Sequence, residues 1–309
     1  MNPPRLQPTK SPQHVRSVTT IPGREQAPRT VSRMTENPIT DALVLITGAA
    51  RGMGELYARR AVAARARAVA LWDIDEDAAT ALAADLSRSG VDVRAYRVDV
   101  SRHEEIVAGL QRVRADLGAP DVVINNAGIV RGKAFWDHDP ERDIEATMRI
   151  NTLAAMWLTR EVLPDMIADA TRPKRILNIA SAAGTLANPN MSVYAASKWA
   201  MVGWSESVRL ELAAHGHGHV KVTTFCPSYI STGMFAGARG PLLTPIMTPR
   251  HATAAAWNGM LRGTPMVLRP WTVKLSMALR GVLPTRAWDV LARHVFKVYS
   301  SMDEFTGRS

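Results

Sequence analysis

The chain has 309 residues, of which 46% are hydrophobic and 21% charged, so it can bury one large core. Its single cysteine, Cys226, excludes an intramolecular disulfide, and no apolar run is long enough to span a bilayer. The net charge of +10 suggests a nucleic-acid partner, yet residues 34–261 carry 24 basic and 24 acidic residues. Because the excess charge lies at the two ends, we predict no nucleic-acid binding.

The composition of the N-terminal segment predicts that residues 1–37 form a disordered, basic, proline-rich tail. Residues 1–33 contain six prolines and six basic residues against one acid, without apolar periodicity. Their arginine content is typical of an organelle transit peptide, but the prolines oppose an amphipathic helix. Two interpretations stay open, a true tail and a stretch upstream of a start at Met34. With no signal-peptide core, we expect a cytoplasmic protein.

Short apolar strands alternate with helical segments between residues 38 and 270. This alternation predicts βαβ units around a parallel sheet. The strands are expected near 42–47, 68–73, 91–98, 121–125, 175–180, 220–226 and 266–269. The helices are expected near 53–65, 76–88, 102–117, 140–168, 193–214 and 249–262.

A glycine-rich turn, Thr47-Gly-Ala-Ala-Arg-Gly-Met-Gly54, follows the first predicted strand. Gly48, Gly52 and Gly54 permit a tight turn and let backbone amides approach a pyrophosphate. The helix that follows offers its positive N-terminal end to that anion, with Met53 in its first turn. This strand, turn and helix match the dinucleotide-binding fingerprint. We therefore predict an α/β fold: a single Rossmann-like, doubly wound domain over residues 38–270 with a seven-stranded parallel sheet.

Asp73 closes the second predicted strand, nineteen residues after Gly54. A carboxylate at this position accepts hydrogen bonds from the adenosine ribose and repels a 2′-phosphate, which favours NAD over NADP. Arg51 argues for the opposite preference, because a guanidinium in the turn attracts such a phosphate. We give Asp73 the greater weight, and so predict NAD, because its place at the end of the second strand is where the adenosine ribose is expected to bind.

Tyr194 and Lys198 lie four residues apart in a predicted helix, and therefore on one face of it. The Lys198 ammonium favours the anionic form of the phenol, and so predicts a pKa for Tyr194 below its usual value of about 10. Ser181, at the end of an apolar run, supplies a hydroxyl that could hold a substrate oxygen. This set suits moving a proton on or off an alcohol oxygen while a hydride moves on or off its carbon.

Together these motifs resemble the short-chain dehydrogenase/reductase family over about residues 42–270. The resemblance implies that Asn151 holds a proton-relay water and completes a catalytic tetrad with Ser181, Tyr194 and Lys198. It implies that Ile230 holds the cofactor carboxamide and that Thr232 hydrogen-bonds the cofactor. The implied cofactor site comprises Gly48, Arg51, Gly52, Met53, Gly54, Asp73, Asp99, Val100, Asn126, Ala127, Gly128, Tyr194, Lys198, Pro227, Ile230 and Thr232.

The function that follows is NAD-dependent interconversion of a hydrophobic alcohol and its ketone or aldehyde, in a homodimer or homotetramer. Two alternatives stay open: an NADP-dependent carbonyl reductase, and a non-catalytic cofactor-sensing scaffold. A weaker resemblance, in the run at 71–74 and the C-terminal extension, is to the subgroup acting on retinoids and steroids. His215, His217 and His219 alternate with glycine but lack a nearby Asp, Glu or Cys, so we predict no metal.

The pattern of apolar and basic residues predicts that residues 271–309 form a basic, amphipathic helical extension. Two helical stretches, 271–283 and 288–299, are separated by Pro284, and residues 262–297 carry seven basic residues against one acid. Tryptophan beside apolar stripes and positive charge is typical of peripheral contact with an anionic membrane. The alternative is that both stretches pack on the protein.

The apolar side chains in residues 234–243 predict that this segment forms a lid over the substrate.

Overall fold

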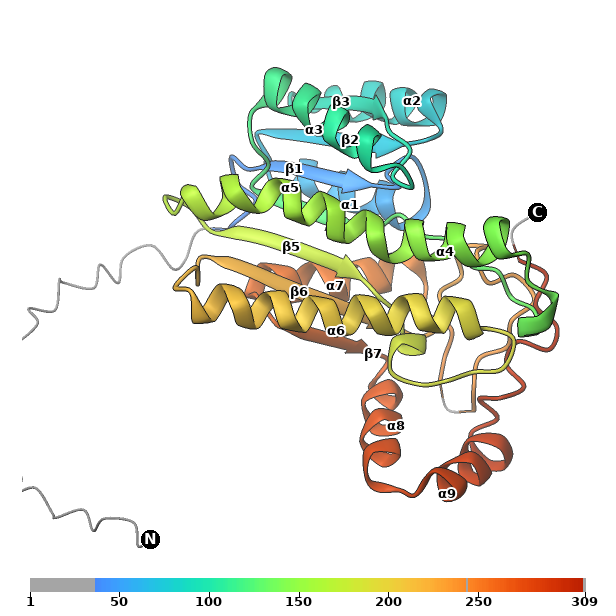
Figure 1. Ribbon diagram of the computed structural model, residues 1–309. Helices are drawn as coiled ribbons and strands as arrows, with labels where there is room; N and C mark the ends of the chain where they lie inside the picture. Colours follow the sequence, from blue (N-terminus) through green and yellow to red (C-terminus); the bar gives the residue numbers. More distant parts are fainter. Residues whose placement is uncertain (1–36, 243, 308–309) are drawn as a thin grey trace, which may run out of the picture. The chain divides into compact units, whose positions relative to one another are not determined.

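The computed structural model describes residues 37–242 and 244–307, so the predicted tail lies outside the described residues except for Asn37. Seven strands form one all-parallel sheet in the order β3-β2-β1-β4-β5-β6-β7 (Figure 1). The predicted fold class is therefore confirmed. The strands are β1 (Leu43–Thr47), β2 (Ala68–Asp73), β3 (Asp92–Arg97), β4 (Val122–Asn125), β5 (Lys174–Ile179), β6 (Val220–Pro227) and β7 (Met266–Arg269).

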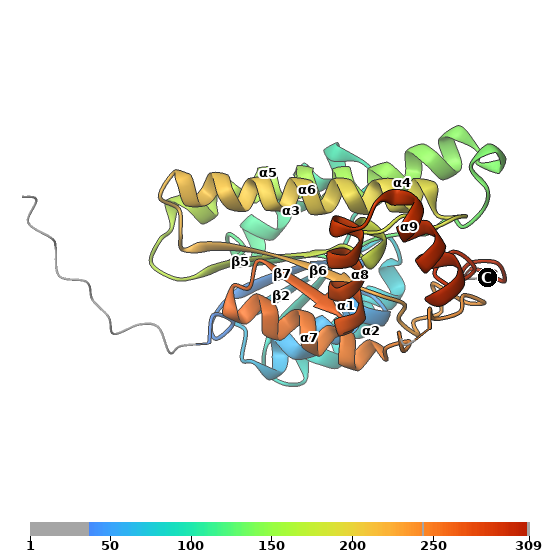
Figure 2. The same ribbon diagram turned by 90° about the horizontal axis from the view of Figure 1, so that it is seen from below.

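Helices cover both faces of this sheet, as Figure 2 shows. One face carries α1 (Gly52–Ala63), α2 (Glu76–Ser87) and α7 (Pro249–Arg262). The other face carries α3 (His103–Leu117), α5 (Ala154–Ala168) and α6 (Ser192–Ala214). Each of these helices lies within two residues of its predicted bounds, except where the segment at 140–168 is subdivided.

Strand β1 shows how the sheet divides the core. All five of its residues are buried, because both faces of a parallel sheet of this kind are covered by helices. Val44 and Ile46 belong to the apolar cluster that includes residues of α1 and α7. Leu43 and Leu45 point the other way and belong to the cluster that includes residues of α3 and α5.

The segment predicted as one helix at 140–168 contains two π-helical turns. These are η3 (Pro140–Glu145) and η4 (Arg149–Leu153), with the short α4 (Ala146–Met148) between them and α5 after them. Apolar periodicity does not reveal such turns, since each adds only one residue to the backbone ring. Asn151 lies in η4, and π-turns inside helices are frequent at functional sites.

The C-terminal extension consists of α8 (Trp271–Val282), α9 (Thr285–Val290) and the π-turn η6 (Leu291–Val295) (Figure 1). The second stretch thus begins earlier than predicted, directly after Pro284, and ends before residue 299. Proline suits a helix start, and Lys297, with φ of 52°, lies outside right-handed helical geometry. Trp288 is buried and packs with Leu186. Among the described residues, no helix combines the length and hydropathy needed to cross a membrane.

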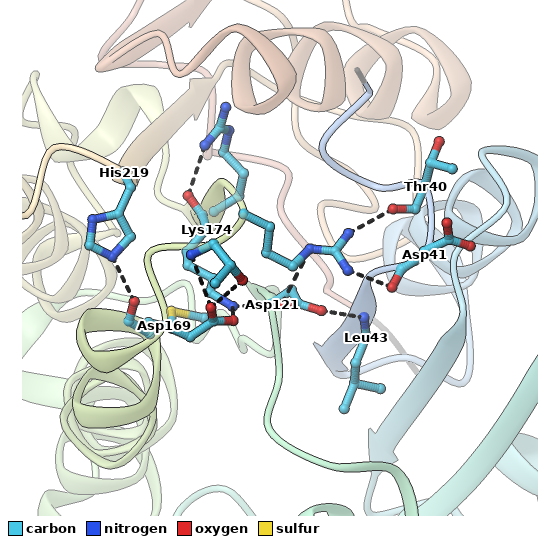
Figure 3. A network of polar contacts seen from close by, with 11 residues as sticks. Thr40, Asp41, Leu43, Asp121, Asp169, Lys174 and His219 are labelled. Atoms are coloured by element: carbon cyan, nitrogen blue, oxygen red, sulfur yellow. Dashed lines mark hydrogen bonds and ion pairs between the residues drawn. The ribbon is translucent and has the colours of Figure 1, made fainter. Parts of the chain in front are cut away.

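A network of charged groups joins the amino ends of the central strands (Figure 3). The two carboxylate oxygens of Asp121 accept from the Leu43 amide at 2.9 Å and from the Lys174 ammonium at 2.7 Å. Lys174 also pairs with Asp169. Arg172 lies 3.5 Å from Asp121 and donates to the carbonyls of Thr40 and Asp41. Strands β1, β4 and β5 are therefore pinned together at the edge away from the carboxyl ends.

Replacing Asp121 with Asn tests this network. The change leaves the Lys174 ammonium, whose side chain is 4% exposed, without its more deeply buried counter-charge. Removing one partner of a buried pair costs about 3–5 kcal/mol, and we expect the free energy of unfolding in urea to fall by that amount. Asp92→Asn, at the exposed pair with Arg94, is the matched control and should cost about 0–1 kcal/mol. Equal small losses in both variants would contradict the structural role.

Candidate active site

The glycine-rich turn brings the backbone of β1 close to the start of α1. Gly48 and Gly52 have φ of 61° and 63°, which side-chain-bearing residues rarely adopt. A Cβ on Gly54 would collide with the carbonyl of Gly48, so this residue permits the helix to pack on the turn. The N-cap residue Arg51 makes no side-chain capping bond to α1. The first amides of α1 therefore form a site suited to an anion.

Hydrogen bonds made by the side chains of Thr47 and Asn126, here called the polar clasp, hold this turn to the end of β4. The Thr47 hydroxyl accepts from the backbone amides of Asn126 and Ala127, at 3.0 and 3.1 Å. The side-chain amide of Asn126 donates to the carbonyls of Thr47 and Gly48, at 3.0 and 2.9 Å. Asn126, a predicted cofactor residue, thus positions the turn. Thr47 was not predicted as a site residue, although it stands at the head of the glycine motif.

The predicted ribose acid, Asp73, lies at the end of β2 and faces the turn. Its carboxylate accepts from the amides of Ala50 at 2.9 Å and Asp75 at 3.1 Å. Arg51 forms an ion pair of 2.6 Å with Asp75. Asp75 is the second functional residue that sequence reasoning missed, and its spacing two residues after Asp73 was the available signal. The guanidinium of Arg51, which in the sequence favoured binding of a 2′-phosphate, is therefore already paired with the carboxylate of Asp75.

Three of the four predicted catalytic side chains lie at the carboxyl edge of β5 and β6. Ser181 follows β5, and its hydroxyl accepts from the Ala183 amide at 3.1 Å. Tyr194 and Lys198 lie on α6 and are both buried. The Lys198 ammonium donates to the carbonyl of Ile179 at 2.8 Å and lies 5.7 Å from the centre of the Tyr194 ring.

Burial dominates the electrostatics of this pair. Burial raises the pKa of the Tyr194 phenol to about 12, and hydrogen bonding with Ser181 offsets this only in part. Burial also lowers the pKa of the Lys198 ammonium to about 8. The sequence predicts a lowered pKa for Tyr194, and the structure differs because desolvation of the phenol outweighs every lowering contribution.

Asn151 is fully buried and its side chain makes three hydrogen bonds. Its oxygen accepts from the Ile129 amide at 2.8 Å, and its nitrogen donates to the Ile129 carbonyl at 2.9 Å and to the Ser197 hydroxyl at 3.1 Å. Ser197 in turn donates to the Tyr194 carbonyl at 2.7 Å. Asn151 thus links the loop after β4 to the helix that carries the tyrosine. Its role in holding a water stays a prediction.

One cleft at the carboxyl edge collects nearly all the predicted residues. Its volume of about 360 Å³ lies in the range of small-molecule sites. Among the predicted residues, only Gly54 and Asn151 lie outside its lining, since both are buried behind it. The lining includes Gly48, Arg51, Gly52, Met53, Asp73, Asp99, Val100, Asn126, Ala127, Gly128, Ser181, Tyr194, Lys198, Pro227, Ile230 and Thr232. A dinucleotide fits this lining, because it offers backbone amides, a ribose-facing carboxylate and a tyrosine–lysine pair.

A second, largely apolar cavity continues from the cleft beyond Ser181, which lines both. Its walls come from the loop before α6, residues 235, 241 and 242 of the predicted lid, α8 and the chain after η6. Three polar side chains connect these walls: Asn188 donates to the hydroxyls of Tyr229 and Ser301, at 3.2 and 2.9 Å. The C-terminal extension is thus part of the site, and its contribution to the cavity was not predicted.

No group of three potential metal ligands occurs within residues 37–242 and 244–307. In the predicted histidine tract, His215 bonds to the carbonyl of Glu211 and His219 to that of Met166. These contacts give both rings structural partners.

Removing the Thr47 hydroxyl tests the clasp. Thr47→Val leaves two backbone amides without their acceptor, and each unsatisfied group costs about 1–3 kcal/mol. For the two amides together we expect a loss of stability of about 2–6 kcal/mol, with weaker nicotinamide cofactor binding in a fluorescence titration. Thr47→Ser retains the hydroxyl and should restore both quantities. Unchanged cofactor affinity in Thr47→Val would show that the clasp does not position the turn.

Comparisons with known proteins identify the family of this chain. A family profile described as short chain dehydrogenase matches residues 42–241. The chain is 33% identical over 258 residues to "Estradiol 17-beta-dehydrogenase 11" of Rattus norvegicus, covering 83% of this chain and 85% of the relative. It is 32% identical over 273 residues to "Epidermal retinol dehydrogenase 2" of Mus musculus, covering 87% of each.

Solved structures show the same architecture. A short-chain dehydrogenase from Sphingobium yanoikuyae in complex with NADPH has a TM-score of 0.66 at 29% identity, covering 79% of this chain and 97% of that one. A short chain dehydrogenase/reductase from Burkholderia phymatum in complex with NAD has a TM-score of 0.71. At 22% identity, with 79% and 94% of the two chains covered, the latter supports the fold alone. The chain therefore belongs to the short-chain dehydrogenase family of NAD(P)-dependent oxidoreductases that act on CH–OH groups.

Proposed function

We propose that this protein interconverts a hydrophobic alcohol and its ketone or aldehyde, with NAD as the preferred cofactor. The observation that carries the proposal is that the cofactor cleft and the apolar cavity are continuous. Ser181 lines both the cleft that holds the predicted cofactor residues and the apolar cavity beyond it. A substrate in that cavity would present its oxygen to the serine and tyrosine while its apolar body stays away from water.

In alcohol oxidation, the Tyr194 phenolate would take the hydroxyl proton and Ser181 would orient the same oxygen. A nicotinamide cofactor held in the cleft would supply the hydride acceptor and, in its oxidised form, a positive charge. Lys198, whose ammonium donates to the carbonyl of Ile179, would bind the nicotinamide ribose. The link from Asn151 through Ser197 to the backbone of Tyr194 would keep the phenol in place. Proton release would follow the water that we assign to Asn151.

The substrate class rests on the cavity walls. Leu186, Met191, Phe235, Leu242 and Val273 are among the apolar side chains that line it. The relatives named for estradiol and retinol also act on lipophilic alcohols, as their names state. We therefore propose a secondary or otherwise lipophilic alcohol of that general kind.

The cofactor preference rests on two carboxylates. Asp73 accepts from the turn amide of Ala50, and Asp75 pairs with Arg51. A 2′-phosphate at the ribose position would meet the negative charge of Asp73, and the Arg51 guanidinium is already paired with Asp75. This arrangement favours NAD, and an NADP-dependent carbonyl reductase is the competing outcome.

A homodimer or homotetramer belongs to the same proposal. Helix α6 exposes Trp199 and Leu210, which are 42% and 56% accessible. Large exposed apolar side chains on one long helix suit a subunit contact. The mass in solution, measured by light scattering, distinguishes these states from a monomer.

Tyr194→Phe tests the catalytic assignment. The change removes the proton-transferring oxygen and keeps the ring, so kcat should fall on the order of 10²–10⁴-fold. Cofactor affinity should be retained. The matched control is Tyr96→Phe, whose hydroxyl bonds to Asp116 outside the cleft. Substantial turnover by Tyr194→Phe would overturn the assignment. If the wild type binds NADH yet turns over no lipophilic alcohol or carbonyl in a broad panel, the scaffold alternative is supported.

The variant carrying Asp73→Ser and Asp75→Asn tests the cofactor preference. Asn at position 75 keeps an acceptor for the N-cap of α2, where Asp75 accepts from the Ala78 amide. The wild type should have the higher kcat/KM with NAD. The variant should shift the NAD/NADP ratio at least tenfold toward NADP, or about 1.4 kcal/mol, because Arg51 is released. A wild-type preference for NADP would reverse the proposal.

A further inference from the structure

Helix α8 carries an apolar stripe whose large side chains are exposed. Trp271, Leu275, Ala278 and Val282 follow the spacing i, i+4, i+7, i+11 and lie on one face. Trp271 is 65% exposed, Leu275 40% and Val282 83%. The opposite face of α8, with Thr272 and Val273, is buried on the protein. The stripe is thus a surface of a well-anchored helix.

This stripe reaches the entrance of the apolar cavity. Trp271 and Leu275 both line the cavity and are exposed, and so is Leu242, at 52% exposure on the facing lid. Side chains that line a cavity and also meet solvent mark its mouth. The mouth is therefore surrounded by large apolar groups, and the apolar cavity behind it reaches Ser181 and the cleft.

Positive charge surrounds the same helix. Lys274 is exposed beside the stripe on α8, and Arg280, Arg286 and Arg293 are exposed along the extension. None of these four forms a salt bridge with any residue in the described part of the chain. The only acid between residues 262 and 297 is Asp289, which accepts from the Tyr299 hydroxyl. The surface therefore suits a negatively charged partner.

We propose that the mouth at α8 docks on an anionic membrane surface, and that the lipophilic substrate enters the cavity directly from the lipid. Tryptophan and leucine at the mouth would lie at the headgroup level, with Lys274 and its basic neighbours against lipid phosphates. The route of substrate entry rests on the proposed function, whereas the docking itself does not. A second copy of the chain is a poorer occupant, because a two-fold contact would bring two positive segments together.

The test is co-sedimentation of the full-length protein with vesicles of phosphatidylcholine, with or without phosphatidylserine, at low and high salt. The wild type should bind the anionic vesicles, and binding should fall in high salt. Two double variants, Trp271→Gln with Leu275→Gln and Lys274→Gln with Arg286→Gln, should each weaken binding about tenfold or more. Circular dichroism and thermal melting establish that each variant is folded.

Matched control variants distinguish binding through this surface from nonspecific binding to vesicles. Trp136→Gln removes another exposed tryptophan, and Arg67→Gln with Lys221→Gln removes two exposed charges at the amino ends of β2 and β6. Both controls should bind as the wild type does. The proposal is overturned if the wild type fails to bind anionic vesicles, or if controls and mouth variants lose binding equally. Self-association that disappears in the mouth variants, without vesicle binding, would assign the surface to a second copy.

An activity measurement addresses substrate entry. The variant with Lys274→Gln and Arg286→Gln alters neither the cleft nor the cavity lining, so its turnover of a water-soluble alcohol should match the wild type. Its turnover of a lipophilic alcohol delivered in anionic vesicles should fall with its binding, and equal turnover would overturn entry from the lipid. Vesicle binding without any turnover would contradict the proposed function alone, and turnover without vesicle binding would contradict the docking alone.

Discussion

The Thr47 hydroxyl, at the end of β1, accepts hydrogen bonds from two consecutive amides at the end of β4, and the site depends on this junction. It lies where the order of the strands reverses, β1 having β2 on one side and β4 on the other. In an open parallel sheet, this reversal opens a crevice beyond the carboxyl ends of the strands. With the turn fixed to β4, the first amides of α1 and the side chains after β2, β5 and β6 all face one cleft.

The catalytic pair illustrates how burial changes the chemistry that a motif suggests. Tyr194 and Lys198 stand one helical turn apart, as their spacing requires, but both are nearly inaccessible to water. Desolvation disfavours the phenolate and the ammonium alike, and so it raises one pKa and lowers the other. The ammonium is satisfied by the Ile179 carbonyl instead of by the phenol. A positive charge bound beside the phenol would lower its pKa again.

The C-terminal extension serves two physical purposes in its two halves. The second half is anchored by Trp288, which is buried with Ala292 and Leu186. The hydroxyl of Ser301 then bonds with Asn188 and Tyr229, which fixes the segment around Ser301 to the wall of the apolar cavity. The first half, α8, contributes one face to the protein and leaves the other at the surface. The cavity therefore exists only because the extension folds back over the carboxyl edge.

The sequence by itself determined the order and type of nearly every element, because apolar runs that are buried on both faces and glycine-rich turns are local signals. It also placed the glycine-rich turn and Asp73 at one edge of the sheet, since the carboxyl ends of parallel strands share that edge, while the family resemblance implied most of the other residues that line the cleft. Only the tertiary structure decided the π-turn that holds Asn151, the pairing of Arg51 with Asp75 and the raised pKa of Tyr194. Each of these depends on a partner or on a depth of burial that spacing along the chain does not encode. The same reason explains why the two halves of the extension differ: the sequence shows apolar stripes on both, but only packing decides which stripe is covered.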